Sequence, residues 1–262
     1  MIQEGDTAKP FSPKGDAHPL LRWACDPPLD GPTNMARDET LLTLVGSGQS
    51  PPTLRFYRWS PATISLGYFQ PIAEFEILPP PAGHLPVVRR TTGGGAILHD
   101  CELTYALVLP WSHPLLKKGP NALYDHVHSA LAEFLGDYGV KVAPGPGTPG
   151  GCSHRGPFFC FERHSCFDLL ADGRKLMGSA QRRTRWAVLQ HGSLILERTY
   201  LQQVSAAVAD TITLDIDANL PALAAAIGGD THVKHRRFTQ AEDDLTEKLY
   251  AKYVDPAWTR RR

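Results

Sequence analysis

Alternating and clustered apolar positions in the first half of the chain predict several strands. Runs rich in aromatic and β-branched residues, each bounded by Pro or Gly, cover residues 54–60, 63–69 and 85–91. Residues 103–109 alternate strictly, with leucines and a tyrosine on one face and Thr, Ala and Val on the other. We expect all four segments to be strands of a sheet.

A second group of strands is predicted around the dipeptide Asp172-Gly173. Residues 166–171 and 174–183 flank this dipeptide, which is typical of a two-residue hairpin turn, and residues 187–196 continue as a third strand. Alternation with period two places these side chains on one face of the second strand: Lys175, Met177, Ser179 and Gln181.

Three segments have helical spacing instead. A short helix is predicted over residues 33–45, and a longer one over residues 121–138, where apolar residues recur at three- and four-residue steps after Asn121 as a cap. Thr239 and Glu242 form a capping-box pair that predicts a helix near the C-terminus.

The order of these elements indicates an α+β fold with a mixed, largely antiparallel sheet flanked by helices, because strands and helices do not alternate as βαβ units. We expect residues 1–18, which are polar and rich in Pro and Gly, to be a flexible leader. Residues 19–262 should form a single catalytic domain with a C-terminal helical extension. Within that domain, residues 145–151 (GPGTPGG) should form a mobile loop.

Charge and composition exclude some partners. With 27 basic and 27 acidic side chains, the formal net charge is zero, which gives no reason to expect nucleic acid or an anionic membrane as the partner. No apolar stretch is long enough for a membrane span, and no apolar signal core precedes the domain, so we expect a cytoplasmic protein. Its five cysteines should be reduced thiols.

The first candidate for chemistry is the segment RRTTGGGAILHD, residues 89–100, in which Gly93, Gly94 and Gly95 follow two arginines. A loop without Cβ atoms lets backbone N–H groups approach a ligand, and Arg90 would favour an anionic or polarised group there. The segment lacks the sequence of a P-loop or a dinucleotide-binding loop. A simple hairpin bend is the alternative.

The second candidate is DGRKLMGSAQRR, residues 172–183. Lys175 there is either a solvated charge at a strand end or a functional group. The small residues Gly178, Ser179 and Ala180 occupy strand positions where bulk would aid packing, which suggests that a ligand lies against the sheet.

Cys160 and Cys166 lie among aromatic residues in FFCFERHSCFDLL, residues 158–170. An apolar setting makes a thiol inert, so either could be buried filler, whereas a nearby cation such as Lys175 would favour the thiolate. A zinc site is the alternative, because five soft ligands lie close together: Cys152, His154, Cys160, His164 and Cys166. Their spacing departs from that of structural zinc sites, so we expect no metal. His99 and His191 are more typical of hydrogen-bonded histidines than of general bases.

Four ordered motifs, RFYRWSPATISLGYFQ, RRTTGGGAILHD, CFERHSCFDLLADGRKLMGSAQRR and LQHGSLIL, resemble the lipoate-protein ligase and octanoyltransferase superfamily, which includes biotin ligases. The resemblance runs from about residue 34 to residue 197 and is closest to the bacterial ligase-like cysteine octanoyltransferases. It implies a biotin/lipoate ligase-like catalytic domain.

The resemblance also implies roles for individual residues. Cys160 would be the nucleophile, and Lys175 would contact the acyl carbonyl. Backbone N–H groups near residues 178–180 would stabilise the oxyanion. The implied substrate-binding residues are Arg90, Gly93, Gly94, Gly95, His99, Gly178, Ser179 and Ala180. We expect Cys160→Ala and Lys175→Ala to abolish transfer while leaving the fold intact.

The implied reaction moves an octanoyl group from acyl carrier protein, through a cysteine thioester, to a lysine of a lipoyl carrier domain. Such domains occur in 2-oxoacid dehydrogenases and in the glycine cleavage H protein. About six buried methylenes at ~0.8 kcal/mol each would contribute roughly 5 kcal/mol to binding. No cofactor is needed, and a monomer is expected.

Three alternatives remain open. An ATP-dependent lipoate-protein ligase would form lipoyl-adenylate with ATP and Mg and needs no cysteine. An octanoyl amidotransferase between lipoyl domains would use the cysteine. A non-catalytic acyl-binding protein would keep the pocket but lack a reactive thiol.

Overall fold

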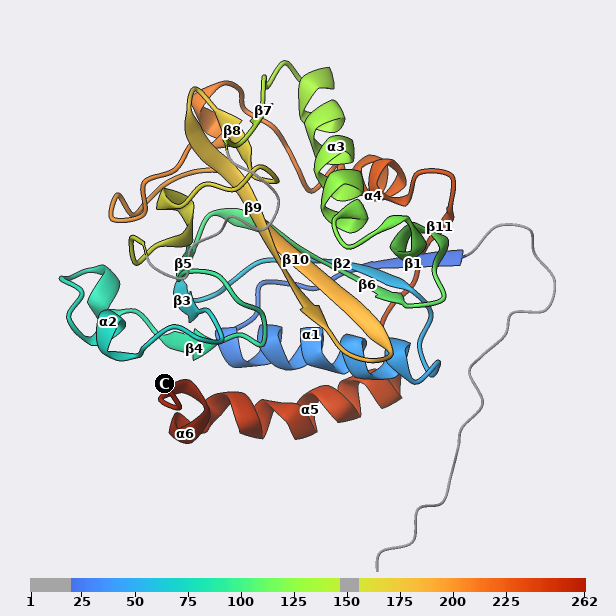
Figure 1. Cartoon of the computed structure of the whole chain (residues 1–262), viewed down its shortest axis with the longest axis horizontal. Coiled ribbons are helices and arrows are strands. Elements are labelled where there is room, and N and C mark those ends of the chain that lie inside the picture. The colour runs from blue at the N-terminus through green and yellow to red at the C-terminus, as the bar shows by residue number, and fades with distance from the viewer. Residues whose placement is uncertain (1–19, 147–155) are drawn as a thin grey trace, which may run out of the picture.

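The computed structural model describes residues 20–146 and 156–262 (Figure 1). The predicted leader, Cys152, His154 and most of the predicted 145–151 loop lie outside the described residues. The described strands are β1 Leu20–Cys25, β2 Thr53–Tyr57, β3 Thr63–Leu66, β4 Val87–Arg89, β5 Ile97–His99, β6 Glu102–Pro110, β7 Ala143–Pro144, β8 Leu169–Ala171, β9 Arg174–Arg183, β10 Ala187–Ile195 and β11 His232–His235. The described helices are α1 Gly31–Gly46, α2 Ala73–Glu76, α3 Ala122–Asp137, α4 Leu220–Gly228, α5 Gln240–Val254 and α6 Pro256–Thr259, with 3-10 helices η1 Ala82–His84, η2 Pro114–Lys118, η3 Cys160–Glu162 and η4 Val208–Asp210.

Two sheets organise the described residues. The main sheet has eight strands in the order β11-β1-β2-β6-β10-β9-β8-β7, and the smaller one has the order β4-β3-β5. In the main sheet β1 runs parallel to β2 and β11, and the other neighbours are antiparallel. The predicted α+β class with a mixed, largely antiparallel sheet is therefore confirmed.

Both faces of the main sheet are covered, which explains why β6 is buried from Glu102 to Leu109. The leucines and Tyr105 of this strand pack into a core shared with α3 and α4. Ala106 and Val108 point to the opposite face and pack into a core shared with α1 and α5. Figure 1 shows these two helix pairs on opposite sides of the sheet. No described helix is both long and apolar enough to cross a bilayer.

The helix predictions hold, with one correction at a cap. α5 begins with the predicted capping box, in which Thr239 and Glu242 exchange hydrogen bonds. Asn121 precedes α3 as predicted, but its side chain makes no capping hydrogen bond. Its backbone, at φ −98° and ψ −12°, lacks the extended conformation typical of a capping residue. At α1, Asp30 is the cap, accepting a hydrogen bond from Thr33 N at 2.8 Å.

The predicted hairpin forms at Asp172-Gly173. Both residues have positive φ, +48° and +74°, as a two-residue hairpin turn requires. The turn pairs β8 with β9 and places Leu170 opposite Lys175. The turn thereby places Lys175 at the start of β9, next to β8.

Strands β1 and β11 and helix α4 were not predicted. β1 contributes Leu21 to a core cluster and joins β2 and β11 through parallel pairing between segments far apart in the sequence. Such pairing leaves no local signal as clear as a hairpin turn does.

Candidate active site

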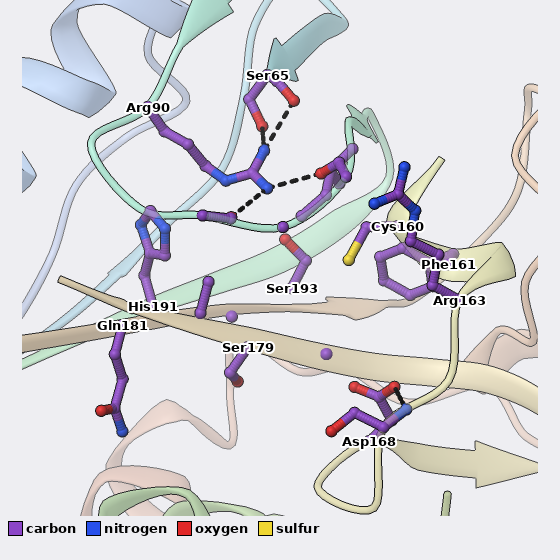
Figure 2. A pocket seen from close by; sticks show the side chains of 18 of the residues that line it. Ser65, Arg90, Cys160, Phe161, Arg163, Asp168, Ser179, Gln181, His191 and Ser193 are labelled. Carbon is purple, nitrogen blue, oxygen red and sulfur yellow. Dashed lines mark hydrogen bonds between the residues drawn. The ribbon is translucent and has the colours of Figure 1, made fainter. Parts of the chain in front are cut away.

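A pocket of about 410 Å³ lies between the two sheets and the segment around Cys160. This volume falls within the range of roughly 300–1,000 Å³ that small-molecule sites occupy. Every residue that the sequence predicts for the site lines this pocket: Arg90, Gly93, Gly94, Gly95, His99, Cys160, Lys175, Gly178, Ser179 and Ala180. Figure 2 shows the part of the pocket around Arg90 and Cys160.

Backbone hydrogen bonds hold Cys160 beside the glycine loop. Its N–H donates to Ala96 O at 2.7 Å, and Ala96 N–H donates to Phe158 O at 3.0 Å. A Cβ on Gly94 would lie 3.8 Å from Cys160 Sγ. Two motifs more than 60 residues apart in the sequence thus meet at one wall of the pocket, with the sulfur pointing inward (Figure 2).

Lys175 is buried beside this thiol. Its side chain is 3% exposed, so the alternative of a solvated strand-end charge is wrong. Nζ lies 3.8 Å from Cys160 Sγ and 3.3 Å from the carbonyl oxygens of Cys160 and Arg163. The cation that a reactive cysteine requires is therefore next to it.

Asp168 is the charged partner of Lys175 and was missed in the sequence. Its Oδ2 lies 2.9 Å from Nζ of Lys175 and accepts a hydrogen bond from Ser165 N at 2.7 Å. Burial raises the pKa of the Asp168 carboxyl, and the Lys175 ammonium opposes that rise. The hairpin register offered a signal, because the turn pairs residues 169–171 with the start of β9 and Asp168 directly precedes them.

Gly178 leaves room for Lys175 rather than directly for a ligand. A Cβ on Gly178 would lie 2.3 Å from Cε and 2.7 Å from Nζ of Lys175. The side chain of Lys175 therefore lies along its own strand, over Gly178, and its Nζ reaches Cys160 from there. The expectation that the small residue makes space for substrate needs this correction at Gly178.

Arg90 holds the glycine loop. Its five N–H groups donate to Thr92 Oγ1, to the carbonyl and hydroxyl of Ser65, and to the carbonyls of Gly93 and Gly95, at 2.6–3.1 Å. Burial lowers its pKa to about 10. Because all five N–H groups are donated to the protein, Arg90 acts on the pocket through the loop.

The loop is a crossover and not a hairpin bend. It connects β4 and β5, which lie on opposite sides of β3, so the bend considered from the sequence is wrong. Gly94 has φ +93°, which favours glycine. Gly67, which the sequence did not single out, packs so closely that a Cβ there would meet Gly94 O at 1.9 Å.

A hydrogen-bonded chain links Arg90 to the core through His191. His191 Nδ1 lies 2.9 Å from Asp38 Oδ2, and Nε2 lies 2.7 Å from Thr92 Oγ1. Because the carboxylate can only accept, Nδ1 carries the proton. Thr92 Oγ1 contacts Nε2 and accepts a hydrogen bond from Arg90 Nε, which completes the chain.

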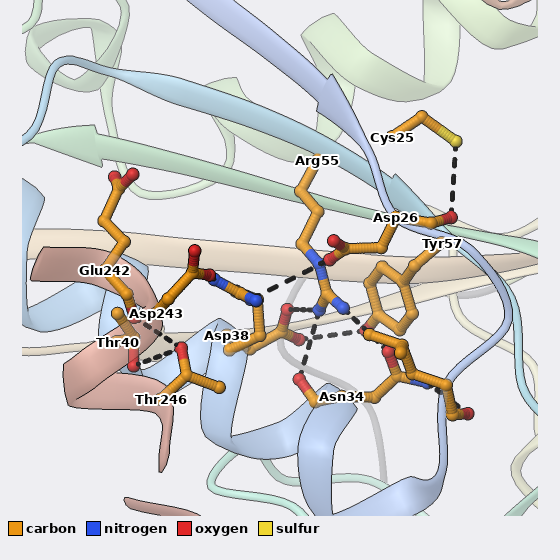
Figure 3. Close-up of polar contacts among 12 residues, drawn as sticks. Cys25, Asp26, Asn34, Asp38, Thr40, Arg55, Tyr57, Glu242, Asp243 and Thr246 are labelled. Atoms are coloured by element: carbon orange, nitrogen blue, oxygen red, sulfur yellow. Dashed lines mark hydrogen bonds and ion pairs between the residues drawn. The ribbon is translucent and has the colours of Figure 1, made fainter. Parts of the chain in front are cut away.

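Asp38 belongs to a buried charge network under α1 (Figure 3). Arg55, fully buried, donates to Asp26 at 2.7 Å, to Asp38 at 2.8 Å and to Asn34 Oδ1 at 2.7 Å. Burial would raise the pKa of Asp38, but hydrogen bonding by His191 and the charge of Arg55 lower it overall. Tyr57 also donates to this carboxylate, at 2.9 Å. The pocket wall is thus anchored to the helix behind it.

His99 lies at the wall of the pocket with both ring nitrogens engaged. Nδ1 lies 2.6 Å from Glu102 Oε1, Nε2 lies 2.7 Å from Ser65 Oγ, and the ring stacks on Trp59. Burial lowers the pKa of His99, and Glu102 opposes this. His99 is a hydrogen-bonded histidine, as expected, and it also lines the pocket.

Ser179 and Ala180 lie in β9 opposite Gly192 and His191 of β10. Ser179 Oγ lies 2.8 Å from Tyr105 OH and 2.7 Å from His128 Nε2. Burial lowers the pKa of His128 to about 4, so this imidazole is neutral near pH 7. Ser179 therefore joins the pocket to α3.

The metal question rests on the described residues alone. Among them, no group of three or more His, Cys, Asp or Glu side chains is arranged to hold a metal ion. Two of the candidate ligands, Cys152 and His154, lie outside that part of the chain. The described cysteines, Cys25, Cys101, Cys160 and Cys166, are free thiols.

The fold is shared with solved lipoate ligases. A protein of T. acidophilum, described as a lipoate protein ligase and solved with lipoic acid, superposes with a TM-score of 0.74 at 23% identity, over 93% of this chain and 100% of that one. A lipoate-protein ligase A solved with ATP gives 0.73 at 22% identity, over 92% and 98%. At these identities the likeness establishes the fold.

Sequence similarity extends to proteins named as octanoyltransferases. The chain is 46% identical over 165 residues to the octanoyltransferase LipM of Moorella thermoacetica and 38% identical over 167 residues to that of Staphylococcus aureus. These matches cover 63% and 62% of this chain, and it spans about 60% of the length of each relative. The model of the lipoyl protein ligase A/B catalytic domain matches residues 30–219, well over half of the chain. The chain therefore belongs to the family of lipoyl protein ligase A/B catalytic domains.

Proposed function

We propose that this protein is an octanoyltransferase that moves an octanoyl group from acyl carrier protein to a lysine of a lipoyl domain through a thioester on Cys160. The observation that carries the proposal is the position of Lys175 Nζ, 3.8 Å from Cys160 Sγ at the wall of the pocket. Similarity to octanoyltransferases supports it, as does the match of the family model to residues 30–219, which include both Cys160 and Lys175.

In the first half-reaction the thiolate of Cys160 attacks the carbonyl carbon of the donor thioester. The bond from that carbon to the carrier sulfur breaks, the carrier thiolate leaves and takes a proton, and a new thioester forms on Cys160. Lys175 stabilises the sulfur anion before the attack and the developing oxyanion during it. Its ion pair with Asp168 holds the ammonium in place.

In the second half-reaction the neutral amine of an acceptor lysine attacks the acyl-enzyme. An amide bond forms, the bond to Cys160 Sγ breaks, and the amine proton passes to the departing sulfur or to solvent. The acceptor would be a lipoyl domain of a 2-oxoacid dehydrogenase or the glycine cleavage H protein. The reaction uses no ATP and no metal.

The thiol beside the buried cation, and not the cation itself, favours a transferase over an ATP-dependent ligase. A ligase activates its acid as an adenylate and has no use for a thiolate, whereas an acyl-enzyme needs one. An amidotransferase between two lipoyl domains would use the same cysteine with a different donor, so the donor must be tested directly.

The deciding experiment is intact-protein mass spectrometry of the full chain mixed with octanoyl acyl carrier protein, without ATP. We expect a gain of one octanoyl group that hydroxylamine removes. The adduct should be absent in Cys160→Ser and retained in Cys166→Ser, which changes a thiol six residues away that does not line the pocket.

Transfer is then followed by adding a lipoyl domain to the isolated acyl-enzyme. Octanoylation of the domain with loss of the adduct would support the full reaction. Absence of an adduct combined with ATP-dependent lipoylation of the domain would instead identify a ligase. An adduct formed from an octanoylated lipoyl domain, but not from the carrier protein, would identify an amidotransferase.

A further inference from the structure

Three arginines surround two aromatic side chains at the mouth of the pocket. Phe69 lines the pocket and is 56% exposed, and its ring packs edge to face on Tyr68 with centroids 4.9 Å apart. The guanidinium carbons of Arg182 and Arg261 lie 5.6 Å and 4.4 Å from the Tyr68 ring centroid, and that of Arg262 lies 5.6 Å from the Phe69 ring. We term these five residues the rim surface.

Contacts far apart in the sequence assemble the rim surface. Arg89, buried in β4, donates both to the carbonyls of Gly67 and Gln70 and to the carbonyl of Thr259 in α6. Ile72 N donates to Arg262 O at 2.9 Å. The C-terminal residues are therefore fixed beside the loop that forms the pocket mouth.

The positive charge of the rim surface has no ion-pair partner in the described part of the chain. No described carboxylate lies within 4.0 Å of Arg182, Arg261 or Arg262, whereas neighbouring Arg260 pairs with Glu76. Burial lowers the pKa of Arg89, and the charges of Arg261 and Arg262 lower it further. Three guanidinium groups without an ion-pair partner among the described side chains thus lie around Tyr68 and Phe69 in a protein of zero formal net charge.

We propose that the rim surface is the docking site for the donor carrier protein, whose acidic face and phosphate-linked arm it would bind. This inference rests on the proposed function, because it assigns the donor of the same pocket. The rings of Tyr68 and Phe69 provide apolar contact, and the three guanidinium groups bind anions. An acyl chain entering past Phe69 would reach the wall that carries Cys160.

Charge favours the donor over the acceptor as occupant. A thioester carried on a phosphodiester-linked arm brings an anion to the pocket mouth, which matches the arginines. An acceptor brings a lysine amine, which is an ammonium in solution and is repelled by them. The acceptor should therefore approach from a different side of the mouth.

The test compares charge-reversal variants with two donors. The variants are Arg182→Glu and the double variant Arg261→Glu/Arg262→Glu, and the matched control is Arg185→Glu, an exposed arginine whose guanidinium lies on Trp186. One donor is octanoyl acyl carrier protein. The other is S-octanoyl-N-acetylcysteamine, an uncharged thioester that has neither phosphate nor carrier.

With the carrier donor we expect KM to rise at least about tenfold in both variants, with kcat within about twofold of the parent chain. Acylation by the uncharged thioester should not change, and added salt should weaken the parent chain more than the variants. Direct binding is measured in Cys160→Ala chains by the fluorescence anisotropy of labelled octanoyl carrier protein, and the same tenfold loss is expected.

Each of the other possible outcomes would contradict a specific part of the proposal. Unchanged KM and binding in the variants, or an equal loss in Arg185→Glu, would remove the rim surface as the donor site. A rise in the KM of the lipoyl-domain acceptor, with the donor KM unchanged, would assign the surface to the acceptor. Weaker carrier binding in the variants without acylation of the parent chain by either donor would keep the docking site and reject the acyl-enzyme.

Discussion

Nζ of Lys175 lies 2.9 Å from Oδ2 of Asp168, and both side chains are almost completely buried, at 3% and 5% exposure. Removing one member of a buried ion pair leaves an uncompensated charge in a medium of low dielectric. Lys175 is therefore a structural residue as well as a candidate catalytic one. Its replacement tests both roles, and the original expectation that Lys175→Ala leaves the fold intact has to be revised.

Lys175→Met should abolish acylation of Cys160 and lower the free energy of unfolding by about 3–5 kcal/mol, because Asp168 loses its counter-charge. The double variant Lys175→Met/Asp168→Asn should recover most of that stability and none of the activity. Urea unfolding and the mass-spectrometric adduct measure the two effects separately. Equal stability of the single variant and the parent chain would show that the ion pair contributes nothing.

Gly178→Ala should disable the site through Lys175. The new methyl group would lie 2.3 Å from Lys175 Cε, so the lysine must leave its position beside Cys160. We expect the rate of Cys160 acylation to fall at least about a hundredfold, as displacement of a catalytic group by about 1 Å can do. Gly136→Ala, in α3 with open space around the new methyl, is the control and should keep full activity. An active Gly178→Ala chain would mean that Nζ need not lie where it does.

Two adjacent glycines should respond differently to alanine. At Gly93 a Cβ meets nothing within 4 Å, and the residue lines the pocket, so Gly93→Ala should fold normally but raise KM for the acyl donor. At Gly94 the φ of +93° strains any side chain and the Cβ would approach Arg90 Nη2 at 3.1 Å. Gly94→Ala should therefore destabilise the fold by about 1–2 kcal/mol, seen as a lower melting temperature, in addition to raising KM for the acyl donor. Calorimetry and donor KM together distinguish the two effects, and identical behaviour of the two variants would contradict this assignment.

Glu242 should make stability depend on pH in the acid range. Burial alone would raise its pKa, but hydrogen bonds from Arg22, Ser50 and the backbone of Thr239 lower it from 4.5 to about 2. A carboxyl whose pKa is lower in the folded state stabilises the fold above pH 4.5, and this contribution is lost as pH falls toward 2. We expect about 2 kcal/mol from this source.

The comparison for Glu242 is the difference in melting temperature between the parent chain and Glu242→Gln, measured from pH 7 to pH 2. That difference should be largest above pH 5 and should shrink progressively below pH 4.5. A difference that stays constant over the whole range would mean that the ionised carboxylate is not what Arg22 requires.

Local sequence signals predicted the elements that local interactions form. Asp172-Gly173 specified its hairpin because both residues tolerate positive φ, and Thr239 with Glu242 specified the start of α5 because the pair satisfies its own backbone donors. The glycine loop and the small residues near Lys175 were found because they depart from what packing alone would place there, whereas Cys160 was distinguished from Cys166 only by the resemblance to the octanoyltransferases. All three features meet in one pocket.

Features that depend on contacts between distant parts of the chain could not be predicted from local sequence signals. Residue 178 must be small because the side chain of Lys175, three residues earlier, lies over it. Period-two alternation along the strand does not reveal this contact. Gly67 is small because a carbonyl of the glycine loop lies against it, and these two segments approach each other only after β3 pairs with its neighbours. The role of Arg90 was likewise hidden, since an arginine next to glycines suggests an anion site as readily as a loop clamp.

Three glycines in a row have the largest backbone entropy of any tripeptide, and a loop built from them would ordinarily sample many shapes before a ligand selects one. Arg90 removes that freedom during folding, because its guanidinium binds the carbonyls on either side of Gly94. The ordering of about three residues, at roughly 1–2 kcal/mol each, is thus completed before any ligand binds. Under the proposed function, binding free energy from an acyl chain would then go into affinity and chain-length selection instead of into shaping the loop.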